Sequence, residues 1–393
     1  MIEEIKKLAK GLQPDLIQIR RHLHQHPELS FAEHNTSKYI QSQLDELGVE
    51  YSVMAKTGIV AMIHGKAPGK CVALRGDIDA LPITETNDVD YASKNIGVMH
   101  ACGHDVHTTC LLGALMIINS IREQFNGSVK FIFQLGEETL PGGASLMIKK
   151  GVLKNPEPKA IFGQHVFPEM LVGKVGFRSG PYMASADEVY LIVKGKGGHA
   201  ALPERLVDPV LITAQLLTGL QQIVSRRSNP KTPSVLSFGK VAANGATNVI
   251  PDKVEIAGTF RTFDEEWRFK AHKLIADFAQ KTAEAAGGQC EVDIRVGDPF
   301  VDNDDQCTRV AKNAAIDFLG ADNVVDLDMR MTAEDFAFYT QEVPGAFYRL
   351  GTRRSEDDEI RGLHTSTFDV DERCLEIGAG LMAHIALESL KYE

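Results

Sequence analysis

The stretch HACGHDVH, residues 100–107, gathers side chains that bind metal ions and carry protons. Its metal-capable residues are His100, Cys102, His104, Asp105 and His107. Thiolate and imidazole groups are the usual ligands of zinc and similar first-row metal ions. Cys102 and His104 lie two residues apart across a glycine, which indicates a shaped turn that presents two metal ligands. The alternative is a polar loop that only caps the following helix.

Two adjacent glutamates, Glu137 and Glu138, follow an apolar run in the stretch LGEETLPGGA, residues 135–144. Neighbouring carboxylates can divide the work of a metal-dependent hydrolase. One binds the metal, and the other stays free as a general base towards a water molecule. Pairs of glutamates are also common on solvated surfaces, so the pair alone does not decide between the two interpretations.

His165 and His364 are further ligand candidates, although either one alone is typical of an ordinary satisfied histidine. The supporting observation is where polar residues fall along the chain. Asp77 and Asp79, the glutamate pair and His165 each come at the end of a different apolar run that reads as a buried strand. Because ligands bind beyond the carboxyl ends of strands in open α/β sheets, we expect these side chains to meet at one edge.

A second group of polar residues lies further along the chain. His199 follows a pair of glycines that let the backbone approach another surface closely, or that form a simple tight turn. Asn248 and Arg261 carry an amide and a guanidinium, which can recognise a carboxylate or a carbonyl group. Either of these two residues alone is more typical of a turn or a surface position.

The elements that must position these residues alternate in the first half of the chain. Apolar runs at 59–65, 71–77, 129–138 and 160–166 predict buried strands. Helical periodicity is found at 2–25, at 30–49 with Ser30 as N-cap, at 107–125 and at 371–392. This alternation predicts an α/β domain with a mostly parallel central sheet flanked by helices.

The pattern changes near residue 184. Residues 186–297 read as strand, helix, strand, strand, helix and strand, which is the ferredoxin-like split pattern of a small α+β domain. The expected organisation is a larger domain formed by residues 1–183 and 296–393, with residues 184–295 inserted into it. A chain of 393 residues exceeds what one core usually supports, which also favours two domains.

The composition argues against two classes of binding partner, nucleic acids and anionic membranes. A net charge of -11 gives no general attraction for nucleic acid or for an anionic membrane, so neither is expected. No run approaches 18 apolar residues, and the first residues lack the apolar core of a signal peptide. The six scattered cysteines favour reduced thiols, and the expected location is the cytoplasm.

Taken in order, several motifs resemble the aminoacylase/carboxypeptidase-like metallohydrolases. They are RRHLHQHPELSFAE, RGDIDALPI, HACGHDVH, GEE followed by GGA, GQHVFP, GGHAALP, ATNVIPD, GTFRTF and LHTSTFD. More narrowly, they resemble the branch of bacterial N-acyl-amino-acid amidohydrolases, hippurate hydrolases and plant auxin-conjugate hydrolases. The resemblance spans about residues 15–375. It implies a metal-binding catalytic domain and an inserted dimerisation or lid domain.

The resemblance also implies a role for each matching residue. The metal ligands would be Cys102, His104, Glu138, His165 and His364, holding two divalent ions of Zn, Mn, Co or Ni. Glu137 would be the general base, and Asp79 would orient a ligand. His199 would reach the active site of a partner subunit and polarise the scissile carbonyl, while Asn248 and Arg261 bind the substrate. His100, Asp105 and His107 would then support the site or begin the helix, and Cys110 would be buried.

The implied reaction is hydrolysis of the amide bond of an N-acyl amino acid, with acetyl, benzoyl or similar acyl groups, by a homodimer or a dimer of dimers. One departure is Asp77, which stands where many relatives in the wider clan have a ligand histidine. Three alternatives stay open. They are a metallo-dipeptidase or carboxypeptidase, an N-acetyl-diaminopimelate-type deacetylase, and a binding protein without catalytic activity.

Overall fold

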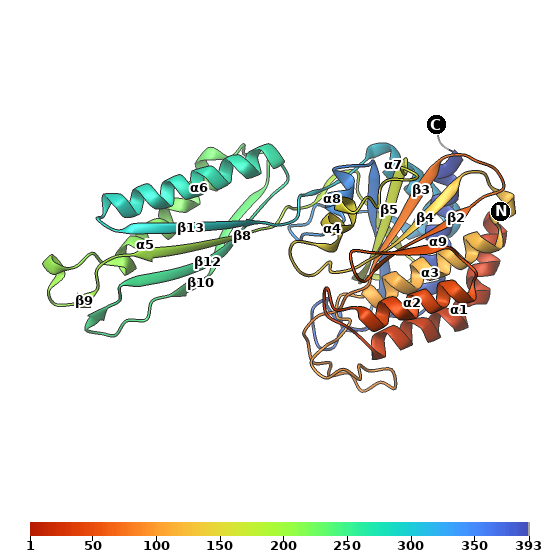
Figure 1. Cartoon of the computed structure of the whole chain (residues 1–393), viewed down its shortest axis with the longest axis horizontal. Coiled ribbons are helices and arrows are strands. Elements are labelled where there is room, and N and C mark those ends of the chain that lie inside the picture. Colours follow the sequence, from red (N-terminus) through yellow and green to blue (C-terminus); the bar gives the residue numbers. More distant parts are fainter. Residues whose placement is uncertain (392–393) are drawn as a thin grey trace. The chain divides into compact units, whose positions relative to one another are not determined.

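The computed structural model describes residues 1–391, which form two compact units (Figure 1). The first unit contains residues 1–182, 302–328 and those from 335 onward. The second contains residues 183–301 and 329–334. The chain thus leaves the first unit within one residue of the expected boundary at 183. It returns six residues after the expected boundary at 295, and a short segment at 329–334 also belongs to the second unit.

The first unit is built on an eight-stranded sheet with the order β1-β2-β4-β3-β5-β16-β6-β15. The strands are β1 (Tyr51–Met54), β2 (Gly58–His64), β3 (Cys71–Asp77), β4 (Ser128–Gln134), β5 (Ala160–Leu171), β6 (Val175–Phe177), β15 (Val324–Asp326) and β16 (Gly345–Arg353). The pairs β4-β3, β3-β5, β5-β16 and β6-β15 are parallel. The remaining three pairs are antiparallel.

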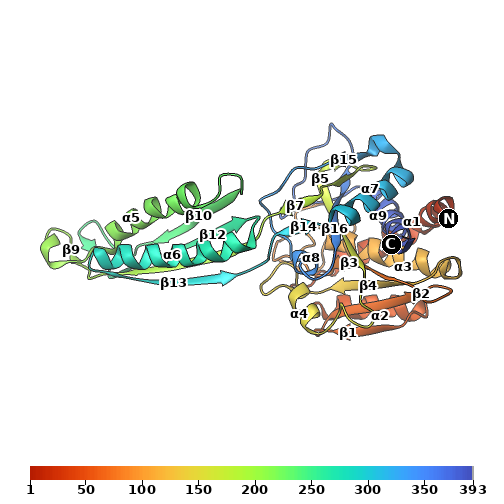
Figure 2. The ribbon, with the colours of Figure 1, turned by 90° about the horizontal axis from the view of Figure 1, so that it is seen from above.

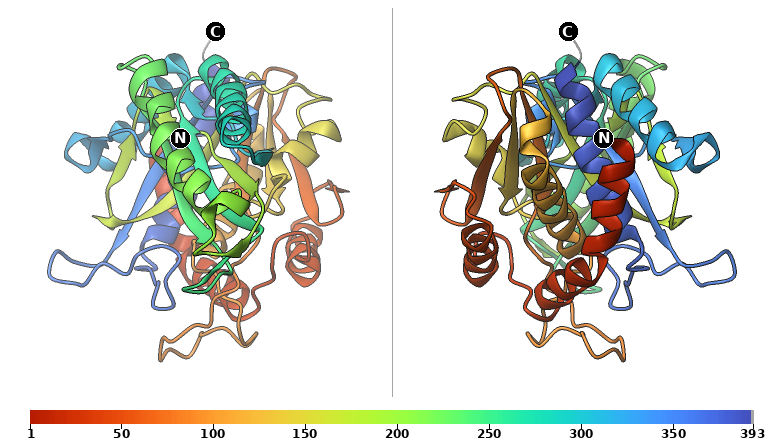
Figure 3. Two further views of the ribbon diagram at one scale, coloured as in Figure 1. Left: turned by 90° about the vertical axis from the view of Figure 1, so that its left-hand side faces the viewer. Right: turned by 90° about the vertical axis from the view of Figure 1, so that its right-hand side faces the viewer.

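Helices cover both faces of this sheet. They are α1 (Ile2–Gln25), α2 (His34–Glu46), α3 (His104–Ser120), α4 (Gly143–Lys149), α7 (Asp305–Leu319), α8 (Ala337–Thr340) and α9 (Cys374–Lys391). In Figure 3, α1 and α9 lie side by side, and they pack with α3 and α7 as one layer. A Cβ atom on Gly163 of β5 would meet Phe336 just before α8, whereas the next residue, Gln164, lies against α9 at Gly378. Because successive side chains of a strand point to opposite faces, α8 lies on the face opposite α9.

The central strands are buried on both faces, as expected for a parallel sheet between helices. Every residue of β3 and of β4 is buried. The expected mostly parallel α/β fold is therefore confirmed. The strand predicted at 71–77 and the helix predicted at 2–25 have these same bounds in the structure.

The predicted start of the second helix is wrong. Helix α2 begins at His34 with Glu33 as its N-cap residue, three residues after the N-cap predicted at Ser30. The hydroxyl group of Ser30 instead donates a hydrogen bond to Oδ2 of Asp79 at 2.7 Å. A contact 49 residues away in the chain therefore replaces the local cap.

The second unit has a four-stranded antiparallel sheet with the order β10-β12-β8-β13. The strands are β8 (Asp187–Lys194), β10 (Ser234–Ala242), β12 (Lys253–Thr262) and β13 (Gln289–Val296). Helices α5 (Pro209–Gln222) and α6 (Glu265–Ala285) pack together on one face, as Figure 2 shows. Strand, helix, strand, strand, helix and strand follow in chain order, so the predicted ferredoxin-like pattern is confirmed.

Four short strands complete the structure. Strands β9 (Gly198–His199) and β11 (Val249–Ile250) pair with each other, as do β7 (Gly180–Met183) and β14 (Val301–Asn303). All six cysteines are buried and free. Within residues 1–391, no helix has the length and apolar character needed to cross a membrane.

Candidate metal centre

A glycine shapes the turn that presents Cys102 and His104. Gly103 is the N-cap residue of α3 and has a φ of 84°, in the left-handed region that favours glycine. A Cβ atom at Gly103 would lie 2.5 Å from Cγ2 of Val166, so no other residue fits without displacement. The glycine therefore lets the start of α3 approach β5, the strand that carries His165.

Cys102, His165, His364 and Glu138 lie around one small space. The Sγ atom of Cys102 is 3.5 Å from Nε2 of His165 and 3.4 Å from Nε2 of His364. The same nitrogen of His364 is 3.3 Å from Oε1 of Glu138. Ligands of one tetrahedral zinc ion lie about 3.5 Å apart, given metal–ligand bonds of about 2.0–2.3 Å. The spacing of these side chains is thus compatible with a shared cation.

His104 faces the same space through its Nε2 atom. Its Nδ1 atom donates to Oδ1 of Asp79 at 3.1 Å. Nε2 lies 3.8 Å from Oε2 of Glu137 and 3.9 Å from Oε1 of Glu138. Within residues 1–391, neither this buried nitrogen nor the buried Oε1 atom of Glu138 has a hydrogen-bond partner. Because buried polar atoms are costly when unpartnered, these two atoms indicate a site that accommodates a ligand.

The charges around His104 favour a cation. Burial alone would lower the pKa of His104, but the carboxylates of Asp77, Asp79 and Glu138 raise it to about 10. Burial and the nearby carboxylates raise the pKa of the Cys102 thiol well above its usual value, so a thiolate here requires a compensating positive charge. The donor set of nitrogen, sulfur and carboxylate oxygen fits a divalent first-row metal ion.

The structure brings all five proposed ligands and Glu137 together. Their ligand atoms fall into overlapping groups within 4.8 Å of one another: Cys102 with His104 and His165, Cys102 with Glu138 and His364, and His104 with Glu137 and Glu138. The residues come from the start of α3, from β5, from the segment after β4 and from the segment before α9. We call the segment after β4, residues 135–142, the glutamate loop.

His107 supports the site instead of offering a free ligand atom. Its Nε2 atom accepts a hydrogen bond from the backbone N–H of Val166 at 3.0 Å, and its Nδ1 atom donates to Oδ1 of Asp77 at 2.6 Å. Both nitrogens are therefore engaged. Asp77 also accepts a hydrogen bond from Nη1 of Arg75 at 2.7 Å, so its two oxygens are held as well. Asp77 thus belongs to a supporting network.

The other polar residues of the opening stretch have separate partners. Asp105 accepts hydrogen bonds from Nε of Arg20 and from Nδ1 of His24, both at 2.8 Å. Although burial opposes ionisation, these two cations hold the pKa of Asp105 well below its usual range. His100 is buried, and Cys110 is buried within α3. Asp105 therefore joins α3 to α1.

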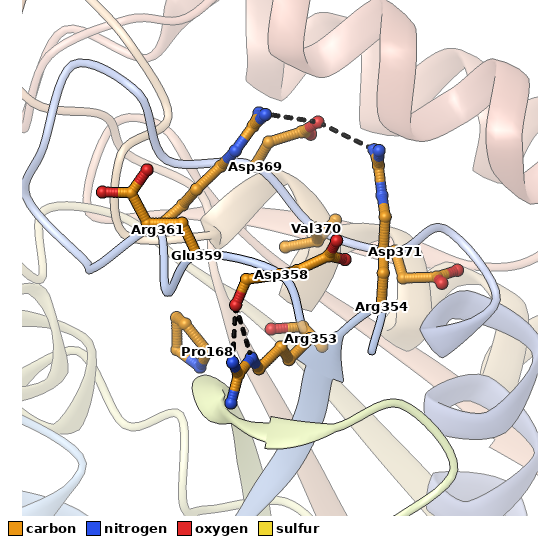
Figure 4. A pocket seen from close by; sticks show the side chains of 10 residues that line it. Pro168, Arg353, Arg354, Asp358, Glu359, Arg361, Asp369, Val370 and Asp371 are labelled. Atoms are coloured by element: carbon orange, nitrogen blue, oxygen red, sulfur yellow. Dashed lines mark hydrogen bonds and ion pairs between the residues drawn. The ribbon is translucent and has the colours of Figure 1, made fainter. Parts of the chain in front are cut away.

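His364 comes from a loop that charged side chains hold in place. Its φ is 59°, which is uncommon for a residue other than glycine, and such strain clusters at functional sites. Figure 4 shows Arg354 and Arg361 facing the carboxylate of Asp369, at 3.2 Å and 3.7 Å. Asp369 also lies 3.2 Å from the buried guanidinium of Arg20. These contacts fix the chain on both sides of His364.

Two acidic residues that hold the glutamate loop were not predicted from the sequence, Glu33 and Asp335. The carboxylate of Asp335 accepts hydrogen bonds from Nε2 of Gln134 at 2.7 Å and from the backbone N–H of Ala144 at 3.0 Å, so it joins the two ends of the loop. It also accepts a bond from Nη2 of Arg75 at 2.6 Å. An arginine within the apolar run CVALRGD does indicate a buried counter-charge, but not which acid supplies it.

The three other predicted site residues lie in the second unit. His199 of β9 and Asn248 are close, since the backbone N–H of Ala200 donates to the carbonyl oxygen of Asn248 at 3.1 Å. Both side chains are exposed. Arg261 lies near the far end of β12, about 26 Å along the strand from its start. Its Nη1 atom donates to the carbonyl oxygen of Met331 at 3.2 Å. Within this unit, the structure brings His199 to Asn248 but not to Arg261.

Comparison with known proteins identifies the class. Residues 73–388 match peptidase family M20/M25/M40. N-acetylcysteine deacetylase of Bacillus subtilis is 39% identical, covering 97% of this chain and 99% of its own. N-acyl-L-amino acid amidohydrolase of Geobacillus stearothermophilus is 44% identical over 74% of this chain and 78% of its own. Thermostable carboxypeptidase 2 of Saccharolobus solfataricus is 37% identical over 100% and 99% of the two chains.

A solved structure agrees with these relatives. A dinuclear metal-binding peptidase of the M20 family from Bacillus subtilis superimposes with a TM-score of 0.83 at 37% identity, covering 97% of this chain and 99% of that one. The chain therefore belongs to peptidase family M20/M25/M40. It is a metal-dependent amidohydrolase, as the sequence predicted.

Proposed function

We propose that the protein hydrolyses the amide bond of N-acyl amino acids and releases a carboxylic acid and a free amino acid. The observation that carries this proposal is the cluster of five ligand-type side chains with Glu137 beside two of them, His104 and Glu138. The names of the deacetylase and amidohydrolase relatives support the same substrate class.

Cys102, His104, Glu138, His165 and His364 would hold two divalent metal ions, and Zn, Mn, Co and Ni are the candidates. When bound, such ions polarise a carbonyl oxygen and lower the pKa of a water molecule. The similarity to the dinuclear metal-binding peptidase of Bacillus subtilis supports the number of ions.

Glu137 is the general base in this proposal. Its Oε2 atom lies 3.8 Å from Nε2 of His104, at the edge of the ligand cluster. From there it takes a proton from the attacking water and passes it to the nitrogen of the leaving amine, because an amine leaves poorly unless it is protonated. Asp79 holds Nδ1 of His104 at 3.1 Å, which orients the ligating nitrogen.

Residues of the second unit recognise the substrate. His199 donates a hydrogen bond to the acyl carbonyl oxygen as negative charge develops there. Asn248 assists His199, and Arg261 pairs with the substrate carboxylate. In this proposal His199 serves the active site of a partner subunit, so the second unit is a dimerisation domain and the working enzyme is a homodimer or a dimer of dimers. The exposure of His199 and its position in the two-residue strand β9 support this role.

The test is hydrolysis of N-acetyl and N-benzoyl amino acids by the metal-loaded Glu137→Gln variant. The kcat should fall about 10²- to 10⁴-fold, since the proton acceptor is lost while the shape is kept. Metal content should stay at the wild-type value by mass spectrometry. Glu169→Gln, at an exposed position of β5, is the matched control and should keep wild-type kcat. Near wild-type activity of Glu137→Gln would contradict the proposed base.

A peptidase acting on dipeptides or on carboxy-terminal residues is the second candidate, because a relative covering the whole chain is named a carboxypeptidase. An N-acetyl-diaminopimelate-type deacetylase would use the same chemistry. A substrate panel of N-acyl amino acids, dipeptides and N-acetylated diamino acids distinguishes the three. We expect the highest kcat/KM for a simple N-acyl amino acid.

A further inference from the structure

The motif RRHLHQHPELSFAE, residues 20–33, has no role in the proposed chemistry, yet its end lies against the glutamate loop. The side chain of Glu33 is completely buried. Its Oε1 atom accepts hydrogen bonds from the backbone N–H groups of Gly136 and Phe31, both at 2.8 Å. Its Oε2 atom accepts one from the hydroxyl group of Thr57, also at 2.8 Å. Glu33 thus links three separate segments of the chain.

The backbone on either side of Glu137 is held by buried carboxylates. The N–H group of Gly136 is held by Glu33, and the N–H group of Glu138 donates to Oδ2 of Asp79 at 3.0 Å. The hydroxyl of Ser30 donates to the same Asp79 oxygen at 2.7 Å. Residues 30–33 therefore reach the glutamate loop directly through Glu33 and indirectly through Asp79.

The side chain of Glu33 does not cap α2, the helix that begins at the next residue. Glu33 is the N-cap residue of α2 but makes no side-chain capping bond. Glu28 supplies that cap, because its Oε2 atom accepts the backbone N–H groups of Asn35 and Thr36 at 2.8 Å each. The carboxylate of Glu33 is free to serve the glutamate loop as a result.

Phe31 also contacts the glutamate loop, and it does so from a strained backbone conformation. Its φ is 64°, a conformation that residues with side chains rarely adopt. A Cβ atom on Gly136 would lie 2.4 Å from Cε1 of Phe31, so the ring lies directly against the backbone of the glutamate loop. Local strain of this kind persists only where the surroundings impose it.

We propose that Glu33 is a positioning residue for Glu137 and Glu138, acting through the backbone of the glutamate loop. Glu33 fixes the N–H group of Gly136, just before Glu137, and Asp79 fixes the N–H group of Glu138, just after it. The expected effect of Glu33 on catalysis rests on the proposed function. Its expected effect on the backbone of the glutamate loop does not.

The experiment compares Glu33→Ala, Glu33→Gln and Glu28→Ala. Glu28 is the matched control, because it is a glutamate of the same segment that also accepts two backbone N–H groups, and these belong to α2 instead of the glutamate loop. We expect Glu33→Ala to lower kcat about 10- to 100-fold with KM changed less than about threefold, as for a misplaced catalytic group. Glu33→Gln should restore most of kcat, since an amide oxygen still accepts both N–H groups. Glu28→Ala should lower the melting temperature and keep kcat.

Hydrogen–deuterium exchange gives a readout that is independent of activity. In Glu33→Ala, exchange should accelerate at residues 136 and 138, and in Glu28→Ala at residues 35 and 36. If the wild type hydrolyses no N-acyl amino acid while these exchange changes appear, the proposed function fails and the positioning role stands. Equal loss of kcat in Glu33→Ala and Glu28→Ala, or unchanged exchange at residue 136, would overturn the positioning role.

Should Glu33→Ala not fold, Thr57→Val replaces it, because it removes one hydrogen bond to Glu33 and keeps the side-chain shape. We then expect a smaller loss of kcat and faster exchange at residue 136. Wild-type values of both quantities in Thr57→Val would count against the proposal.

Discussion

At the scale of single residues, two carboxyl groups of the second unit have pKa values shifted in opposite directions. Asp187 accepts hydrogen bonds from Nε of Arg268 at 2.9 Å and from Nε2 of His272 at 2.7 Å, and its pKa is lowered although burial opposes this. Asp298 has one oxygen without a hydrogen-bond partner within the described residues. Burial and repulsion from Glu334 raise its pKa to about 7. Ionised Asp187 therefore stabilises the fold, whereas ionised Asp298 costs stability.

We predict that Asp298→Asn raises the melting temperature at about pH 8 by about 2–4 °C. In the unfolded chain the pKa of the Asp298 carboxyl group is near 3.8. Between pH 3.8 and pH 7, only the folded state therefore keeps the proton. Stability is therefore lost as the pH rises through this window, and the gain from asparagine should be smaller at about pH 5. Thermal unfolding at both pH values tests this.

Asp187→Asn is the control for this measurement. It removes a carboxylate that is paired with Arg268, so it should lower the melting temperature at both pH values. A gain for Asp298→Asn that is equal at the two pH values would contradict the assigned cause.

At the scale of elements, glycines allow α3 to pack closely on its neighbours and so fix the helix that begins with His104. A Cβ atom on Gly113 would lie 2.7 Å from Cβ of Ala379 in α9. One on Gly378 would lie 2.6 Å from Sγ of Cys110 in α3. Small residues on both sides of the contact thus set the distance between the two helices.

We predict opposite effects from one substitution at two helical glycines. Gly378→Ala should lower stability by about 1–3 kcal/mol, because the new methyl group overfills the contact between α3 and α9. Gly11→Ala in α1 should raise stability by about 0.5–1 kcal/mol, since a Cβ atom there meets nothing within 4 Å and alanine favours the helix. Denaturant unfolding measures both. Equal changes would show that helix propensity, and not packing, decides at Gly378.

Local patterns were sufficient to predict most elements. Periodicity indicated the helix at 2–25, and an apolar run indicated β3, with the bounds that the structure has. The start of α2 was wrong because Ser30 binds Asp79, a contact that no local pattern contains. Strand β5 runs to Leu171, beyond the predicted end at 166, because its later residues still pair with β16.

The same difference between local and distant contacts explains what could be predicted of the site. The ligand candidates were recognisable because their residue types are rare and their motifs resemble a known family. Glu33 and Asp335 were missed because each holds the glutamate loop from about 100 residues or more away in the chain, through backbone N–H groups. A carboxylate with such partners has no distinctive sequence pattern.

At the scale of the whole molecule, the proposed chemistry is divided between the two units. The ligand candidates and Glu137 belong to the first unit, and His199, Asn248 and Arg261 belong to the second. The proposal that His199 acts on a partner subunit therefore makes activity a property of the dimer.

The final prediction follows from that proposal. His199→Ala and Glu137→Ala, each inactive alone, should regain activity when mixed after unfolding and refolding. A mixed dimer carries one site with both an intact Glu137 and the intact His199 of the partner, so it should show about half of the wild-type activity per dimer. Two different affinity tags isolate the mixed dimer before the assay. An isolated mixed dimer as inactive as its parents would show that His199 does not act across subunits. Failure to recover any mixed dimer from chains that refold would contradict the dimer itself.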